Sequence, residues 1–137
     1  MKLHICAGIG GVRPDLLLFL EGLPPKLRQK LILEFAMLTS TPLGLLGEPH
    51  VKHFSLEKYR EFYELRAKGG KVMVRIIFTQ MGGKILLLFP FEKKQARDTE
   101  KALEMALKLL AEIRAGRRET MELPVHDLEA VVCCRSG

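Results

Sequence analysis

Hydrophobic and polar positions divide the first forty residues into one strand and two helices. Residues 1–7 alternate between apolar and polar side chains, which predicts a strand with one buried face. After a glycine-rich break, Pro14 suits the first turn of a short helix that Gly22 ends. A second helix is predicted to begin at Pro24-Pro25. Its apolar residues recur at helical spacing: Leu27, Leu31, Phe35 and Leu38. Its polar face is expected to carry Lys26, Gln29, Lys30 and Glu34.

Residues 59–94 predict three short antiparallel strands joined by two Gly-Gly turns. If the first turn is centred on Gly69-Gly70, Glu64 lies opposite Arg75, and Arg66 lies opposite Met73. A second turn centred on Gly82-Gly83 then places Leu87 and Phe89 beside Phe78 and Ile76.

Strand alternation separates the charges of this meander from its apolar side chains. Glu64, Arg66 and Arg75 share one face, where both guanidiniums are within reach of one phosphate. The helices are expected to cover the opposite face, which holds Tyr63, Val74 and Phe89. The plainer interpretation of Glu64 and Arg75 is a cross-strand ion pair worth a fraction of a kcal/mol.

A third helix is predicted from a cap at Asp98 or Thr99 to about Ala115, closed by Gly116. The predicted fold class is therefore α+β, with an N-terminal strand, a two-helix hairpin, an antiparallel meander and a C-terminal helix. Residues 1–116 are expected to form one domain. Residues 117–137 are expected to be a tail that is partly disordered or adds a final short element.

The apolar runs are too short or too often interrupted by charge to predict a membrane span or a secretory signal, so a cytoplasmic location is expected. Three cysteines, Cys6, Cys133 and Cys134, show no CxxC spacing and predict neither a disulfide framework nor a zinc site. Structural or incidental roles are expected for them. No metal-ligand cluster, Ser/His/Asp set or cofactor motif is evident, and no metal or cofactor is predicted.

The net charge of +6 is concentrated in and around the meander. Residues 52–97 contain 11 Lys and Arg against 4 Asp and Glu. Such a surplus is either a footprint for a phosphate-bearing partner or a solvated face.

Five segments, in this order and spacing, resemble toxins of the RelE/HigB group, especially the phage-derived HigB-like branch. They are residues 11–31, 46–54 (LGEPHVKHF), 62–66 (FYELR), 74–78 (VRIIF) and 86–99, and the resemblance spans roughly residues 1–115. It implies a RelE-like fold and the toxin of a type II toxin–antitoxin system. The implied partners are a cognate antitoxin and mRNA on the ribosome, with operator DNA contacted only through the antitoxin complex.

The resemblance also implies a metal-independent mRNA endonuclease, in which the ribose 2′-OH attacks the adjacent phosphate. Such a reaction needs positive charge at the phosphorane and groups that move protons. The implied catalytic residues are Arg66, Arg75, Lys93 and Glu64. The implied RNA- or phosphate-binding residues are Lys52, His53, Lys94 and Arg97.

This sequence departs from the RelE/HigB pattern at two positions. Phe89-Pro90-Phe91 replaces a His-Gly-Phe motif, and Val74 replaces an aromatic residue before Arg75. Glu64, His53 and Lys93 are the candidate proton-transfer groups. The alternatives are a ParE-like toxin that inhibits DNA gyrase and a catalytically inactive relative that binds nucleic acid or antitoxin.

Overall fold

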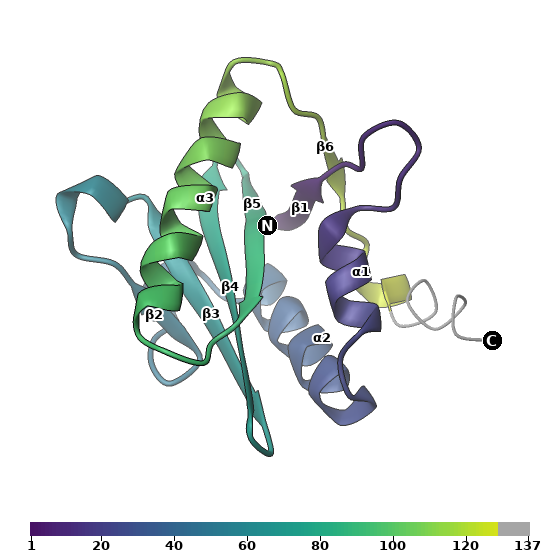
Figure 1. Cartoon of the computed structure of the whole chain (residues 1–137), viewed down its shortest axis with the longest axis vertical. Coiled ribbons are helices and arrows are strands. Elements are labelled where there is room, and N and C mark those ends of the chain that lie inside the picture. The colour runs from purple at the N-terminus through teal and green to yellow at the C-terminus, as the bar shows by residue number, and fades with distance from the viewer. Residues whose placement is uncertain (129–137) are drawn as a thin grey trace.

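The computed structural model describes residues 1–128, which form a six-stranded sheet with helices on both faces (Figure 1). The strands are β1 (Lys2–Cys6), β2 (Val51–His53), β3 (Phe62–Gly69), β4 (Val72–Met81), β5 (Lys84–Glu92) and β6 (Thr120–Glu122). The helices are α1 (Asp15–Glu21), α2 (Pro25–Ser40) and α3 (Arg97–Arg114), with single 3-10 turns at Leu43–Leu45, Glu57–Tyr59 and Val125–Asp127. The predicted α+β class is confirmed.

The strand order is β2-β3-β4-β5-β1-β6. The meander β3-β4-β5 is antiparallel as predicted, but β1 joins it in parallel, beside β5. The short strands β2 and β6 add an antiparallel edge on each side. Because β2 pairs only with residues 63–65 of β3, the rest of β3 toward the β3–β4 turn has no strand on that side.

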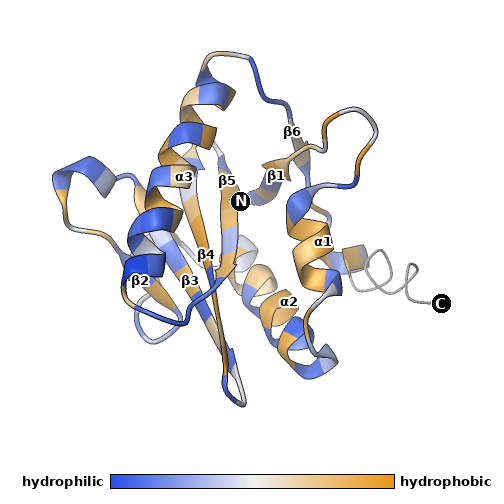
Figure 2. Cartoon of the chain, in the orientation of Figure 1, coloured by the Kyte–Doolittle hydropathy of each residue, from blue (hydrophilic) through white to orange (hydrophobic). Residues whose placement is uncertain are grey.

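The two faces of the sheet are covered by different helices, as Figure 1 shows with α3 on one side and α1 and α2 on the other. The helices α1 and α2 bury their apolar stripes against the face that carries Leu65, Val74 and Ile76. The helix α3 packs on the other face, against Ile77 and Leu86. In Figure 2 the outward side of α3 is largely hydrophilic.

This arrangement corrects the expectation that the helices cover one face. Side chains of alternating strand positions are buried on both sides of β4 and β5, so both faces need a cover. Arg66 and Arg75 therefore share their face with α3.

The register of β3 and β4 also differs from the predicted one by two residues. Arg66 lies directly opposite Arg75, and Glu64 lies opposite Ile77. Gly69 pairs with Val72 and belongs to the strand, so the turn consists of Gly70 and Lys71. Gly70 has the positive φ, 61°, that glycine adopts readily. A shift of two residues preserves the side-chain alternation, so the predicted grouping of Glu64, Arg66 and Arg75 on one face of the sheet holds.

A β-bulge changes the predicted pairing of β4 with β5. Phe78 lies opposite Leu87 as predicted, and the Gly82-Gly83 turn is correct. A register shift between Ile77 and Phe78 then puts Phe89 opposite Ile77, on the α3 side. The prediction that Phe89 lies with Ile76 is therefore wrong.

The segment after α3 adds to the sheet and to the core. Leu123 and Leu128 are buried in the cluster under α1 and α2. A division of the chain at Gly116 stays a prediction, and Cys133 and Cys134 lie outside the described residues.

The helix α3 begins at Arg97, before the expected cap at Asp98 or Thr99. The Asp98 carboxylate instead accepts the backbone N–H groups of Lys94 and Gln95, which precede the helix. Among residues 1–128 no helix is long and apolar enough to cross a bilayer.

Replacing Gly69 by alanine should destabilise the protein by about 1 kcal/mol, because the added Cβ would lie 3.2 Å from Leu27 Cβ on α2. Gly83→Ala is the control, because a Cβ there meets nothing within 4 Å. Urea unfolding of both variants measures the difference. An equal loss in the two would contradict the close contact of β3 with α2.

Candidate functional site

Three charged side chains meet on the α3 face of the sheet, near the open part of β3. Arg66 Nε donates to Glu64 Oε1 at 2.9 Å, and Arg75 Nε lies 3.7 Å from the same oxygen. Glu64 is 1% exposed, while the side chains of Arg66 and Arg75 are 24% and 12% exposed. Each guanidinium carries five N–H donors, and these contacts use only some of them.

The arrangement places two like charges directly opposite each other across a strand pair, which is unfavourable by itself. Glu64 offsets the repulsion because its carboxylate lies between both guanidiniums. Burial lowers the pKa of the Arg75 guanidinium, and Glu64 opposes that shift. In the described part of the chain, Glu64 Oε2 and Arg75 Nε have no hydrogen-bond partner.

A hollow of about 510 Å³, here named the arginine hollow, adjoins this cluster at the open edge of β3. It is lined by Lys30, Leu33, Glu34, Pro49, His50, Arg66, Ala67, Lys68 and Arg75. The edge is closed by groups other than a strand. The Arg66 N–H donates to the carbonyl of His50 at 2.8 Å, and Lys30 Nζ donates to the carbonyl of Lys68 at 2.6 Å.

Glu34 of α2 brings a carboxylate into the same hollow. Its side chain is 12% exposed, and its Oε2 lies 3.4 Å from His50 Nδ1. Burial raises the pKa of Glu34 to about 7, although Lys30 and Arg75 act in the opposite direction. A carboxyl with that pKa exchanges its proton near neutral pH.

The two candidate residues of β2 lie on opposite faces. Lys52 is opposite Glu64 in the register and shares its face, with Nζ 5.4 Å from the centre of the Phe54 ring. His53 is opposite Tyr63 and stacks on that ring at 4.6 Å. The structure therefore brings Lys52 to the arginine face but turns His53 away from it.

The basic residues after β5 lie outside the hollow. The backbone N–H of Lys93 donates to Met73 at 2.8 Å, which continues the pairing of β5 with β4. Lys94 lines a separate depression beside the first turns of α3, and Arg97 is the first residue of that helix. The structure does not place Lys93, Lys94 or Arg97 among the residues that line the arginine hollow.

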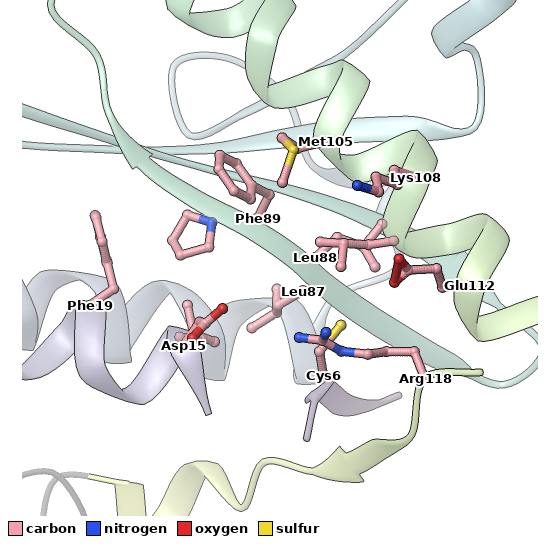
Figure 3. Close-up of a pocket in the computed structure, with 13 residues that line it drawn as sticks. Cys6, Asp15, Phe19, Leu87, Leu88, Phe89, Met105, Lys108, Glu112 and Arg118 are labelled. Atoms are coloured by element: carbon pink, nitrogen blue, oxygen red, sulfur yellow. The ribbon is translucent and has the colours of Figure 1, made fainter. Parts of the chain in front are cut away.

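A second hollow, of about 360 Å³, lies between α1, β5 and α3 (Figure 3). Its lining is mostly apolar, and Figure 3 shows the Arg118 side chain reaching toward Cys6. Burial raises the pKa of the Cys6 thiol, although Arg118 opposes the rise. A thiol with a raised pKa is a poor nucleophile, so this hollow offers less chemistry than the first.

Among residues 1–128, no three His, Cys, Asp or Glu side chains gather as ligands of a metal ion. The chemistry that the arginine hollow offers is phosphate binding by guanidiniums, with a carboxyl close by that titrates near pH 7.

A family model described as "Phage derived protein Gp49-like (DUF891)" matches residues 18–111. The chain belongs to this Gp49-like family. The family is associated with the toxins of toxin–antitoxin systems. No curated protein and no solved structure matches the chain.

The Gp49-like match runs from within α1 to within α3 and includes every residue that lines the arginine hollow. The family assignment thus agrees with the phage-derived branch of the resemblance, whereas the finer RelE/HigB likeness stays a prediction.

Glu34 is the main site residue that the sequence analysis missed, since it was assigned to the polar face of α2. A signal for it exists in the sequence. Leu27, Leu31, Glu34 and Leu38 follow one another at intervals of four, three and four residues, the spacing of a buried helical stripe. A lone glutamate at such a position indicates a carboxyl that is drawn toward the core.

Arg75→Met should destabilise the protein by about 2 to 4 kcal/mol, because it removes one of the two charges that compensate the buried Glu64. Adding Glu64→Gln to Arg75→Met should recover at least half of that loss, since a neutral amide is less costly to bury. Urea unfolding of the single and double variants tests this. A double variant less stable than Arg75→Met alone would contradict the compensating role of Arg75.

Glu34→Gln should stabilise the protein at alkaline but not at acidic pH. The pKa of Glu34 is raised from 4.5 to about 7 on folding, so its favourable contribution is complete below pH 4.5 and is lost as the pH rises through 7. Glutamine mimics the protonated carboxyl and keeps that contribution. The expected gain at pH 8 is about 1 to 3 kcal/mol, allowing for solvent screening.

Urea unfolding between pH 4 and pH 8 measures this difference. Glu100→Gln on the exposed side of α3 controls for the substitution itself. A gain for Glu34→Gln that is the same at both ends of the pH range would contradict the raised pKa.

Proposed function

We propose that this Gp49-like chain is the toxin of a type II toxin–antitoxin pair and cleaves mRNA on the ribosome in the cytoplasm. The observation that carries the proposal is the pair Arg66 and Arg75, held side by side by one buried carboxylate. Two preorganised guanidiniums suit a phosphate that gains negative charge when it becomes pentacoordinate.

The charge around the pair supports an anionic substrate. Lys30 and Lys68 line the hollow with the two arginines, and Lys52 lies on the same face beside Glu64. The negative groups nearby are partly compensated: Glu64 lies between the arginines, Glu48 lies 3.6 Å from Arg66, and burial raises the pKa of Glu34, which lines the hollow, to about 7. An RNA backbone that enters at the open edge of β3 meets mainly positive side chains.

The reaction proposed is attack of the ribose 2′-OH on the adjacent phosphorus, without a metal ion, as the RelE/HigB resemblance implies. Arg66 and Arg75 bind the non-bridging oxygens and stabilise the charge that develops on them. Glu64 accepts a hydrogen bond from Arg66 and lies 3.7 Å from Arg75, so it keeps the two arginines together. Its side chain is too buried to contact RNA itself. A cognate antitoxin would silence the chain by covering this basic surface.

The proposal predicts that induced expression in a bacterium arrests growth and produces new mRNA 5′ ends within reading frames. The site variant Glu64→Gln with Arg66→Gln and Arg75→Gln should abolish both effects, since it removes the phosphate-binding pair without leaving the buried carboxylate unpaired. Mapping of mRNA 5′ ends and growth curves are the measurements.

The matched control is Glu57→Gln with Arg60→Gln and Lys101→Gln, which changes the net charge equally at exposed positions. It should retain arrest and cleavage. Growth arrest with intact mRNA and induction of DNA-damage genes would overturn the proposal in favour of gyrase inhibition. Cleavage that persists in a folded site variant would show that the site lies elsewhere.

A further inference from the structure

Two carboxyl groups lie close to Arg66 and Arg75, and they differ in what they can reach. Glu64 Oε1 is held between Arg66 and Arg75, and its side chain is 1% exposed. Glu34 lines the hollow from the α2 side and is 12% exposed, with His50 as its ion-pair neighbour. Among the carboxyl groups of residues 1–128, Glu34 is the one that lines the hollow, and it is not held between the two guanidiniums.

The charged groups that surround Glu34 come from every element beside it. Lys30 lies one turn earlier on α2, His50 precedes β2, Arg66 and Lys68 belong to β3, and Arg75 belongs to β4. Burial has the largest effect and raises the pKa to about 7, while Lys30 and Arg75 oppose it. Glu34 thus stays basic enough to take a proton near neutral pH, yet it is ionised in a useful fraction of molecules.

The position of Glu34 relative to the arginines fits general-base catalysis. A phosphate bound to Arg66 and Arg75 would occupy the hollow that Glu34 also lines. The ribose attached to that phosphate carries the 2′-OH next to the reacting phosphorus. The carboxylate and the guanidiniums are therefore presented to adjacent groups of one nucleotide.

We propose that Glu34 is the general base that accepts the proton of the ribose 2′-OH, an assignment that rests on the proposed RNA cleavage. In this step the 2′ oxygen forms a bond to phosphorus and its proton passes to the Glu34 carboxylate. The bond from phosphorus to the 5′ oxygen breaks, and the 5′ oxygen takes a proton from water. The products are a 2′,3′-cyclic phosphate and a 5′-OH, with no change in oxidation state.

The test is single-turnover cleavage of a short mRNA bound to ribosomes, measured from pH 5.5 to pH 9. The wild-type rate should rise with pH and level off above about 7. Glu34→Gln should cleave at least about 100-fold more slowly and lose this rise. Glu34→Asp, which keeps a carboxylate, should recover part of the rate, and the exposed α3 variant Glu100→Gln should cleave normally.

A modified substrate separates a base from an acid. When sulfur replaces the 5′ bridging oxygen, the leaving group needs no proton, so a missing general acid is compensated but a missing general base is not. Glu34→Gln should remain slow on this substrate. Recovery of the wild-type rate would overturn the assignment of Glu34 as the base.

The remaining outcomes separate this inference from the proposed function. If Glu34→Gln cleaves normally while the Glu64, Arg66 and Arg75 variant does not, the general base is wrong and RNA cleavage stands. If the wild-type chain does not cleave, both are wrong. Binding of a 2′-deoxy substrate analogue should be unchanged in Glu34→Gln, and a loss of that binding would indicate a binding role instead.

Discussion

The burial of one carboxylate between two arginines is the constraint on which the proposed site depends. A buried charge is tolerated only when it is compensated, and Glu64 has Arg66 and Arg75 as neighbours on its own sheet face. The same contact makes the repulsive pairing of two arginines acceptable. The Glu64 carboxylate thus holds Arg66 by a hydrogen bond and lies 3.7 Å from Arg75, so the two arginines of the proposed phosphate site stay together without a ligand.

The surrounding architecture leaves this cluster accessible from one side. The helix α3 covers the sheet face over β4 and β5, and α2 covers the opposite face. The edge strand β2 pairs with β3 only at residues 63–65, so no strand pairs with the outer edge of β3 beyond that point. Side chains from α2, from the segment before β2 and from both central strands converge there, and they form a hollow instead of a packed edge.

Much of the site could be predicted from local pattern, but its full composition could not. Strand alternation groups Glu64 with Arg66 and Arg75, whatever the register, because a shift of two residues keeps each side chain on its face. Glu34 belongs to a segment about thirty residues away, and its approach to Arg75 depends on how α2 lies across the sheet. In the same way, local sequence could not show that His53 turns toward Tyr63, or that Lys93 and Lys94 stay outside the hollow.

The α+β class, the main helices and the antiparallel meander follow from the sequence by itself, because apolar periodicity and glycine turns act over a few residues. Only the tertiary structure decided that β1 joins β5 in parallel, that α3 covers the arginine face and that a bulge moves Phe89 across the sheet. It also decided which glycine turns the chain, since Gly69 pairs with Val72 in the sheet and Gly70 takes the positive φ. These features depend on packing between distant segments, which no local pattern encodes.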